Sequence, residues 1–117
     1  MSTRKTTRRY VPDCGDIVHI HFAAPLGSAV GPHKAALIVS PKSYNDKTGL
    51  MVCCAITEHV KGYPFEVPLD AGGGQVALAD QPKSLNWSDT RITLEGKATP
   101  DELAQTRAKL RALLFHE

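Results

Sequence analysis

The chain has 117 residues, of which 42% are hydrophobic and 22% are charged, and its formal net charge is +2. A chain of this size forms one globular domain with a core that does not depend on disulfide bonds. The composition excludes a membrane-spanning helix, because no apolar run approaches the ~18 residues that a span requires. The N-terminus also lacks the apolar segment of a signal peptide, so we expect a cytoplasmic protein.

The cysteines and histidines indicate no metal or disulfide framework. The chain has three cysteines, an odd number: Cys14, Cys53 and Cys54. Cys53 and Cys54 are adjacent within an apolar run. We therefore expect reduced thiols. No CxxC occurs and no His/Cys spacing is typical of zinc, so we expect no metal and no other cofactor.

Positive charge is concentrated at the N-terminus, where four basic residues precede the first acid, Asp13. Residues 1–9 are predicted to form a flexible basic arm, and residues 10–117 a single domain. The arm is either a solvated terminus or a contact for a polyanion.

The first predicted strand is Ile17–Phe22, in which apolar and polar residues alternate. Val18 and Ile20 share one face, and His19 and His21 share the other. We expect the two histidines to face solvent rather than bind a metal, because no third ligand is evident.

Two apolar runs predict buried strands. A loop rich in proline and glycine, residues 23–33, leads into Ala35–Val39. Pro41–Gly49 is polar and typical of turns, with Tyr44 predicted to point inward. Leu50–Ile56 then provides seven apolar residues without charge, which favours a strand buried on both faces.

Polar residues follow at once, at Thr57–His59, and Lys61–Pro64 turns the chain into a strand at Phe65–Val67. A short strand is predicted at Gln75–Leu78. The next segment is polar, and Pro82 indicates that it is not a central strand.

The C-terminal part of the chain predicts a strand at Arg91–Glu95 and then a helix. Thr99 and Glu102 form a capping box around Pro100, which suits a first turn. The apolar stripe of this helix is predicted to contain Leu103, Leu110, Leu113 and Leu114. The fold class is therefore mainly β (α+β), a small antiparallel barrel with one C-terminal helix.

Candidate functional residues lie at the ends of three predicted strands: His33, Lys34, Thr57, Glu58, His59, Asp80 and Gln81. If these ends converge, they offer a cation, a hydroxyl, a carboxamide and an imidazole, which together can bind a phosphodiester. RNA cleavage without metal needs only proton transfer and charge stabilisation, because the 2′-hydroxyl is a built-in nucleophile. From residue types alone, the alternative that polar residues simply end the strands stays open.

Four motifs resemble the MazF/PemK (Kid) toxin family: Tyr10–Val18, Ser40-Pro41 with Tyr44-Asn45, Lys61–Val67 and Ala77–Leu85. They occur in the family's order and spacing, from Tyr10 to the final helix. The resemblance implies a sequence-specific, metal-independent endoribonuclease that cleaves single-stranded RNA, the toxin of a type II toxin–antitoxin pair. It further implies an SH3-like barrel, a homodimer, and a cognate antitoxin whose acidic, extended tail lies over the RNA groove.

The resemblance also assigns site residues. The family's catalytic threonine falls on Thr57, where Ala55 replaces the usual proline, and its active-site arginine falls on Lys34. The family's acid falls on Ala29. Lysine keeps the charge of arginine but loses its bidentate fork. The remaining residues implied to bind RNA are Ser28, His33, Glu58, Gln81 and Lys83.

Two alternatives follow from these departures. The chain is either an active nuclease or a weakened or silent relative that still binds RNA and antitoxin. A third possibility is a non-catalytic toxin that has the same barrel and poisons DNA gyrase. The retained Thr57 and the Lys61–Val67 motif argue against it.

Overall fold

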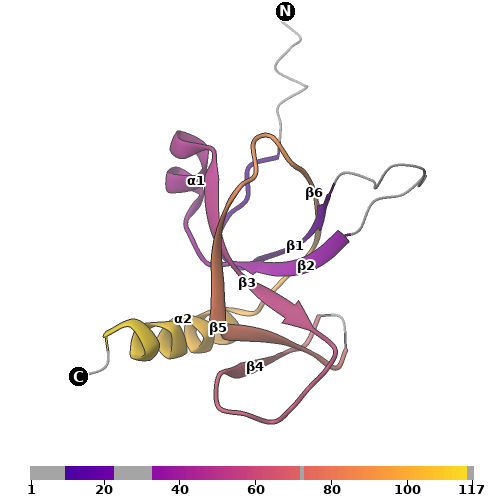
Figure 1. The fold of residues 1–117 in the computed structure, drawn as a ribbon, viewed down its shortest axis with the longest axis vertical. Coiled ribbons are helices and arrows are strands. Elements are labelled where there is room, and N and C mark those ends of the chain that lie inside the picture. Colours follow the sequence, from indigo (N-terminus) through magenta and orange to yellow (C-terminus); the bar gives the residue numbers. More distant parts are fainter. Residues whose placement is uncertain (1–9, 23–32, 72, 116–117) are drawn as a thin grey trace, which may run out of the picture.

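The computed structural model describes residues 10–22, 33–71 and 73–115 (Figure 1). The predicted arm, residues 1–9, lies outside these ranges. Six strands form one antiparallel sheet in the order β4-β5-β3-β2-β1-β6. The elements in chain order are β1 (Asp16–His21), β2 (His33–Ile38), α1 (Lys42–Thr48), β3 (Leu50–Thr57), β4 (Glu66–Leu69), β5 (Gln75–Asn86), β6 (Arg91–Lys97) and α2 (Pro100–Phe115).

The sheet confirms the predicted mainly-β class, with β4 and β6 at its two edges rather than joined into a closed barrel. Its strands curve strongly, and α2 lies near the middle of β5 (Figure 1). Each face of the sheet carries its own hydrophobic cluster. We call them the Val18 cluster, formed by Val18, Ile20, Ala36, Ile38, Met51, Cys53 and Trp87, and the Leu37 cluster, formed by Ile17, Leu37, Val67, Leu69 and Ala77.

The prediction for Pro41–Gly49 is wrong in two respects. The segment contains the short helix α1, and Tyr44 is 40% exposed instead of pointing inward. Asn45 is the residue that turns in, with no exposed surface. Its amide donates hydrogen bonds to the carbonyl oxygens of Pro12, at 2.7 Å, and Ser40, at 3.1 Å. These backbone partners outside α1 explain the inward orientation, because a buried carbonyl needs a donor.

The segment around Pro82 is a strand, although the proline stands within it. β5 continues through it, and Pro82 is the partner of Cys54 in the ladder between β3 and β5. The prediction that this segment is not a central strand agrees with the pairing, because β4 pairs with residues 75–78 and the described pairing at Pro82 is with β3 alone. The ladder also shifts beside this pair: Ile56 pairs with Ala77, so the single residue Ala55 lies opposite the four residues Leu78–Gln81. Proline is tolerated at strand edges and bulges, where its missing amide proton interrupts no ladder bond.

The C-terminal helix begins with the predicted capping box. The amide of Glu102 donates to the Thr99 hydroxyl at 3.1 Å, and the amide of Thr99 donates to the Glu102 carboxylate at 2.9 Å. The same carboxylate accepts the amide of Asp70 at 2.8 Å, which ties α2 to the end of β4. No helix among the described residues is long and apolar enough to cross a membrane.

The last turn of α2 does not pack as predicted. Leu113 and Leu114 are 44% and 60% exposed, although both were expected on the apolar stripe. The buried contacts of the helix come from Glu102 and Thr106 in its first half. The C-terminal half of the helix projects to one side of β5 (Figure 1), and Leu110 and Leu114 line a pocket there with Val39.

Candidate active site

Lys34 and Thr57 lie on the same face of the sheet, on the neighbouring strands β2 and β3. Side chains alternate along a strand, so Lys34 shares the face of Ala36, and Thr57 shares the face of Cys53. Both Ala36 and Cys53 belong to the Val18 cluster. The lysine and the threonine therefore extend the side of the sheet that this cluster covers.

The pairing of β2 with β3 ends just before the two residues. Ala36 pairs with Ala55, and this is the last pair of the ladder in that direction. Lys34 on β2 and Thr57 on β3 each lie two residues beyond this pair, where β2 begins and β3 ends.

The third strand of the site is β5, which supplies Gln81 and Lys83. Lys83 pairs with Cys53 and so projects from the same face as Thr57. Burial raises the pKa of the Cys53 thiol to about 11, and the nearby charge of Lys83 opposes this shift, as expected for neighbours on one face. Gln81 is two residues before Lys83 and shares its face by alternation. We call Lys34, Thr57, Gln81 and Lys83 the active face.

The exposure of these side chains suits contact with a ligand. Lys34, Gln81 and Lys83 are exposed, and Thr57 is half-buried. The Thr57 hydroxyl accepts the amide of His59 at 3.1 Å, which fixes it at the point where β3 ends. Glu58 and His59 are exposed in the segment that follows.

The segment after β3 is held by two carboxylates. Glu66, which is only 9% exposed, accepts the amides of Lys61 and Gly62, each at 2.8 Å. The Tyr63 hydroxyl donates to Asp80 at 2.9 Å. Sequence reasoning did not give Glu66 and Tyr63 a role, although the Lys61–Val67 motif that contains them was recognised.

The side chains of two predicted site residues, Ser28 and His33, are not described by the structure. Ser28 lies outside the described residues, as does Ala29, the position on which the family's acid falls. The backbone of His33 begins β2 and pairs with His21 of β1, but its side chain lies outside the description. The site as described therefore rests on Lys34, Thr57, Glu58, Gln81 and Lys83.

The two histidines of β1 are half-buried and interact with β6. His19 Nδ1 lies 3.6 Å from the Glu95 carboxylate, and His21 Nε2 lies 2.8 Å from the Thr93 hydroxyl. They occupy the face opposite Val18 and Ile20, as predicted. Across the described ranges, no group of three or more His, Cys, Asp or Glu side chains is arranged to hold a metal ion.

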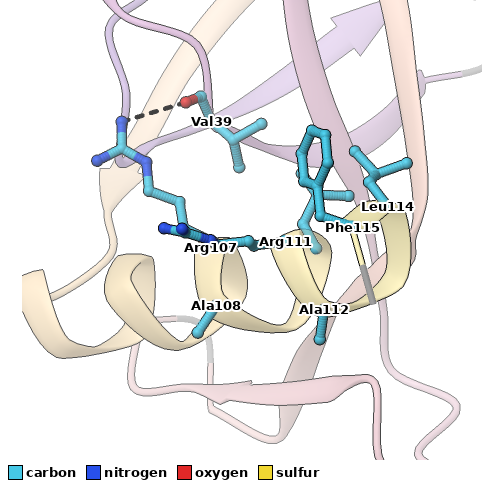
Figure 2. Close-up of a pocket in the computed structure, with 8 residues that line it drawn as sticks. Val39, Arg107, Ala108, Arg111, Ala112, Leu114 and Phe115 are labelled. Atoms are coloured by element: carbon cyan, nitrogen blue, oxygen red, sulfur yellow. Dashed lines mark hydrogen bonds between the residues drawn. The ribbon is translucent and has the colours of Figure 1, made fainter. Parts of the chain in front are cut away.

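A pocket beside α2 is separate from the active face (Figure 2). It lies between Val39, just past the end of β2, and the last turns of the helix, where Phe115 is 71% exposed. Arg107 borders it and donates to the Val39 carbonyl at 3.2 Å. Val39 is five residues from Lys34, or about 16 Å along an extended strand.

The fold and the active face together define a class: a small β protein that presents a hydroxyl, two ammonium groups and a carboxamide on one face of a curved sheet. The model of the "PemK-like, MazF-like toxin of type II toxin-antitoxin system" family matches residues 13–114. The chain belongs to this family, which confirms the resemblance that its motifs indicated.

Named relatives match nearly the whole chain. The endoribonuclease toxin MazF of Escherichia coli strain K12 is 43% identical over 107 residues, which cover 91% of this chain and 96% of that protein. The solved structure of MazE-MazF (Form-III) from Deinococcus radiodurans has a TM-score of 0.79 at 45% identity, covering 90% of this chain and 97% of that one. An endoribonuclease in complex with its cognate antitoxin, from a mycobacterial species, shares the fold with a TM-score of 0.70 at 23% identity.

Proposed function

We infer that this protein is an endoribonuclease, the toxin of a type II toxin–antitoxin system, and that it cleaves single-stranded RNA without a metal. The inference is supported by family membership and by the E. coli relative, which is named an endoribonuclease toxin. The observation that carries the site assignment is the active face, where three neighbouring strands present Lys34, Thr57, Gln81 and Lys83 on one side.

The proposed reaction is an internal transfer of the RNA phosphodiester. The 2′-hydroxyl loses its proton and attacks phosphorus, the bond to the 5′-oxygen breaks, and the leaving oxygen gains a proton. The products are a 2′,3′-cyclic phosphate and a 5′-hydroxyl. In this proposal the Lys34 ammonium stabilises the charge on the phosphate oxygens and gives the leaving oxygen its proton, water takes the proton of the 2′-hydroxyl, and the Thr57 hydroxyl orients the phosphate or the nucleophile.

The remaining residues of the site bind the RNA strand in this proposal. Lys83 provides a point charge for a neighbouring phosphate, and Gln81 and Glu58 hydrogen-bond to bases that are flipped out of the strand. Ser28 and His33 are proposed to bind RNA from the segment before and at the start of β2. Selectivity for sequence then comes from these loop and strand-end side chains.

The partners follow from the same family membership. We propose that a cognate antitoxin with an acidic, extended tail covers the active face. The D. radiodurans structure contains MazE together with MazF, and the mycobacterial endoribonuclease is in complex with its cognate antitoxin. Charge complementarity to Lys34 and Lys83 favours such a tail. We further propose that the protein is a homodimer and acts in the cytoplasm, on mRNA.

The test is cleavage of a long RNA of mixed sequence by the purified protein in EDTA. We expect cuts at recurring sites, and a loss of about 10²–10³ in rate for Lys34→Ala and for Thr57→Ala, the scale of losing one well-placed donor. Lys47→Ala is the matched control, because Lys47 is an exposed lysine on α1. Intact RNA with a folded wild-type protein that still binds RNA would instead indicate a silent relative.

A further inference from the structure

The segment that follows Thr57 is joined to the bulge of β5 by a single side-chain hydrogen bond. Tyr63 lies in the turn before β4, and its hydroxyl donates to Asp80 Oδ1 at 2.9 Å. Asp80 belongs to the four residues of β5 that lie opposite Ala55. The next residue, Gln81, belongs to the active face, so this bond connects the two sides of the site.

The neighbouring contacts hold both partners of this bond in place. On the Tyr63 side, the Glu66 carboxylate accepts the amides of Lys61 and Gly62, each at 2.8 Å. On the Asp80 side, the amide of Ala79 donates to the Phe65 carbonyl at 2.9 Å. The turn is therefore folded by Glu66, and the Tyr63–Asp80 bond fixes where the folded turn lies against β5.

The bulge is where the ladder holds β5 least. One residue of β3 lies opposite four residues of β5, so β3 pairs with none of residues 78–81. Leu78 pairs with Glu66 of β4, and the amide of Ala79 bonds to Phe65, so Asp80 and Gln81 lie between these contacts and the pair of Pro82 with Cys54. The hydrogen bond from Tyr63 therefore holds β5 at the residue directly before Gln81.

We propose that Tyr63 and Asp80 are positioning residues of the RNA site, which hold Gln81 at the distance and angle from Thr57 that cleavage requires. Neither residue contacts the reacting atoms in this proposal. The proposal rests on the proposed endoribonuclease function, and it adds to that function two residues that join the turn before β4 to β5. A donor shifted by about 1 Å can cost up to ~10² in rate, which sets the scale of the effect.

Four variants test the hydrogen bond itself. Tyr63→Phe removes only the hydroxyl, Asp80→Ala removes the acceptor, Asp80→Asn keeps one acceptor oxygen, and the fourth combines Tyr63→Phe with Asp80→Ala. We expect Tyr63→Phe and Asp80→Ala each to lower kcat for RNA cleavage about tenfold and to change KM less than about twofold. The double variant should lose no more than either single one, because both remove the same interaction. Asp80→Asn should restore most of the rate.

The matched control is Tyr44→Phe, because Tyr44 is a tyrosine with 40% exposure on α1, in a different part of the fold. It should cleave RNA at the wild-type rate. Wild-type kinetics in Tyr63→Phe, or additive losses in the double variant, would overturn the proposal. A fall in rate that follows only a fall in melting temperature would also overturn it, since it would indicate a structural role.

Amide hydrogen exchange separates this proposal from the proposed function. In Tyr63→Phe we expect faster exchange at Ala79, whose amide bonds to Phe65 across the junction of the turn with β5. Exchange should be unchanged at Lys61 and Gly62, which Glu66 holds, and at the centre of β3. Unchanged exchange at Ala79 would contradict the positioning role even if the wild-type protein did not cleave RNA. An inactive wild-type protein with faster exchange at Ala79 in the variant would contradict the proposed function, although the Tyr63–Asp80 bond would still be shown to hold the turn against β5.

Discussion

The two ends of the sheet use polar side chains in opposite ways. At the α1 end, Asn45 is fully buried, and its side chain bonds to the Ser40 hydroxyl and to the backbone carbonyls of Pro12 and Ser40. The backbone carbonyl of Asn45 accepts a hydrogen bond from the Trp87 indole at 2.9 Å. On the active face, Lys34 and Gln81 are exposed to solvent. Both regions contain motifs that resemble the same family. The difference shows that the Ser40–Asn45 motif builds the fold, whereas the strand-end residues are available for a ligand.

A second buried polar group reinforces the α1 end. Asp16 is 2% exposed and accepts hydrogen bonds from the Tyr10 hydroxyl, the Asp13 amide and Lys97, the last at 2.8 Å. Burial, followed by the bond to Asp16, raises the pKa of Tyr10 far above its usual value. The start of the domain is thereby fastened to the end of β6, far along the chain.

The largest effect on stability is expected from Asn45→Ala. The substitution removes the amide that donates to the carbonyls of Pro12 and Ser40 in a buried site. The Ser40 hydroxyl loses the Asn45 side chain but keeps its bonds to the Val52 backbone. An unsatisfied buried group costs about 1–3 kcal/mol, so we expect a loss of roughly 3–5 kcal/mol in the free energy of unfolding, measured with urea. Asn86→Ala is the control, because Asn86 is exposed. A similar loss in both variants would contradict the distinction between the two ends.

A smaller effect, of the opposite sign, is expected on the active face. Lys34→Arg restores a planar fork that can bind a phosphate through two hydrogen bonds. We expect kcat/KM for RNA cleavage to rise about tenfold, which corresponds to ~1.4 kcal/mol, with the free energy of unfolding unchanged because Lys34 is exposed. Lys47→Arg serves as the control. A lower rate in Lys34→Arg would indicate that the compact ammonium of lysine itself takes part in the reaction, for example as the proton donor.

The regular parts of the fold could be predicted because their signals are local. Alternation marks β1, a seven-residue apolar run marks β3, and the capping box of Thr99 and Glu102 marks the start of α2. The helix α1 gives no such signal. It has seven residues, and Pro41 at its N-cap makes no side-chain capping bond.

What could not be predicted depends on residues far apart in the sequence. Pro82 is tolerated in β5 because that part of the strand pairs with β3 alone, beside a shift of the ladder, and both are properties of the assembled sheet. The bond between Tyr63 and Asp80 spans seventeen positions. The convergence of Lys34, Thr57 and Gln81 stays a prediction from the strand ends, and the alternation of β2, β3 and β5 supports it by setting the three side chains on one face.

A further prediction concerns the two buried thiols of β3, and it tests the rigidity of the core and not its stability or activity. Burial raises the pKa values of Cys53 and Cys54 to about 11, so a smaller fraction of each thiol is ionised at pH 8 than for an ordinary thiol. Only the thiolate is nucleophilic, and we therefore expect both to react with iodoacetamide roughly 10²-fold more slowly in the native protein than after unfolding. Reaction should accelerate as the pH rises towards 11.

Cys14 is the internal reference for this measurement, because it is half-buried at the α1 end of the domain. The native protein should carry a label at Cys14 and still cleave RNA, and Cys14→Ser should remain almost unlabelled. Rapid labelling of Cys53 in the native protein would mean that the core beneath Lys83 opens readily. The active face would then be a mobile surface, and the rigid spacing that the Tyr63–Asp80 bond is proposed to maintain would lose its structural support.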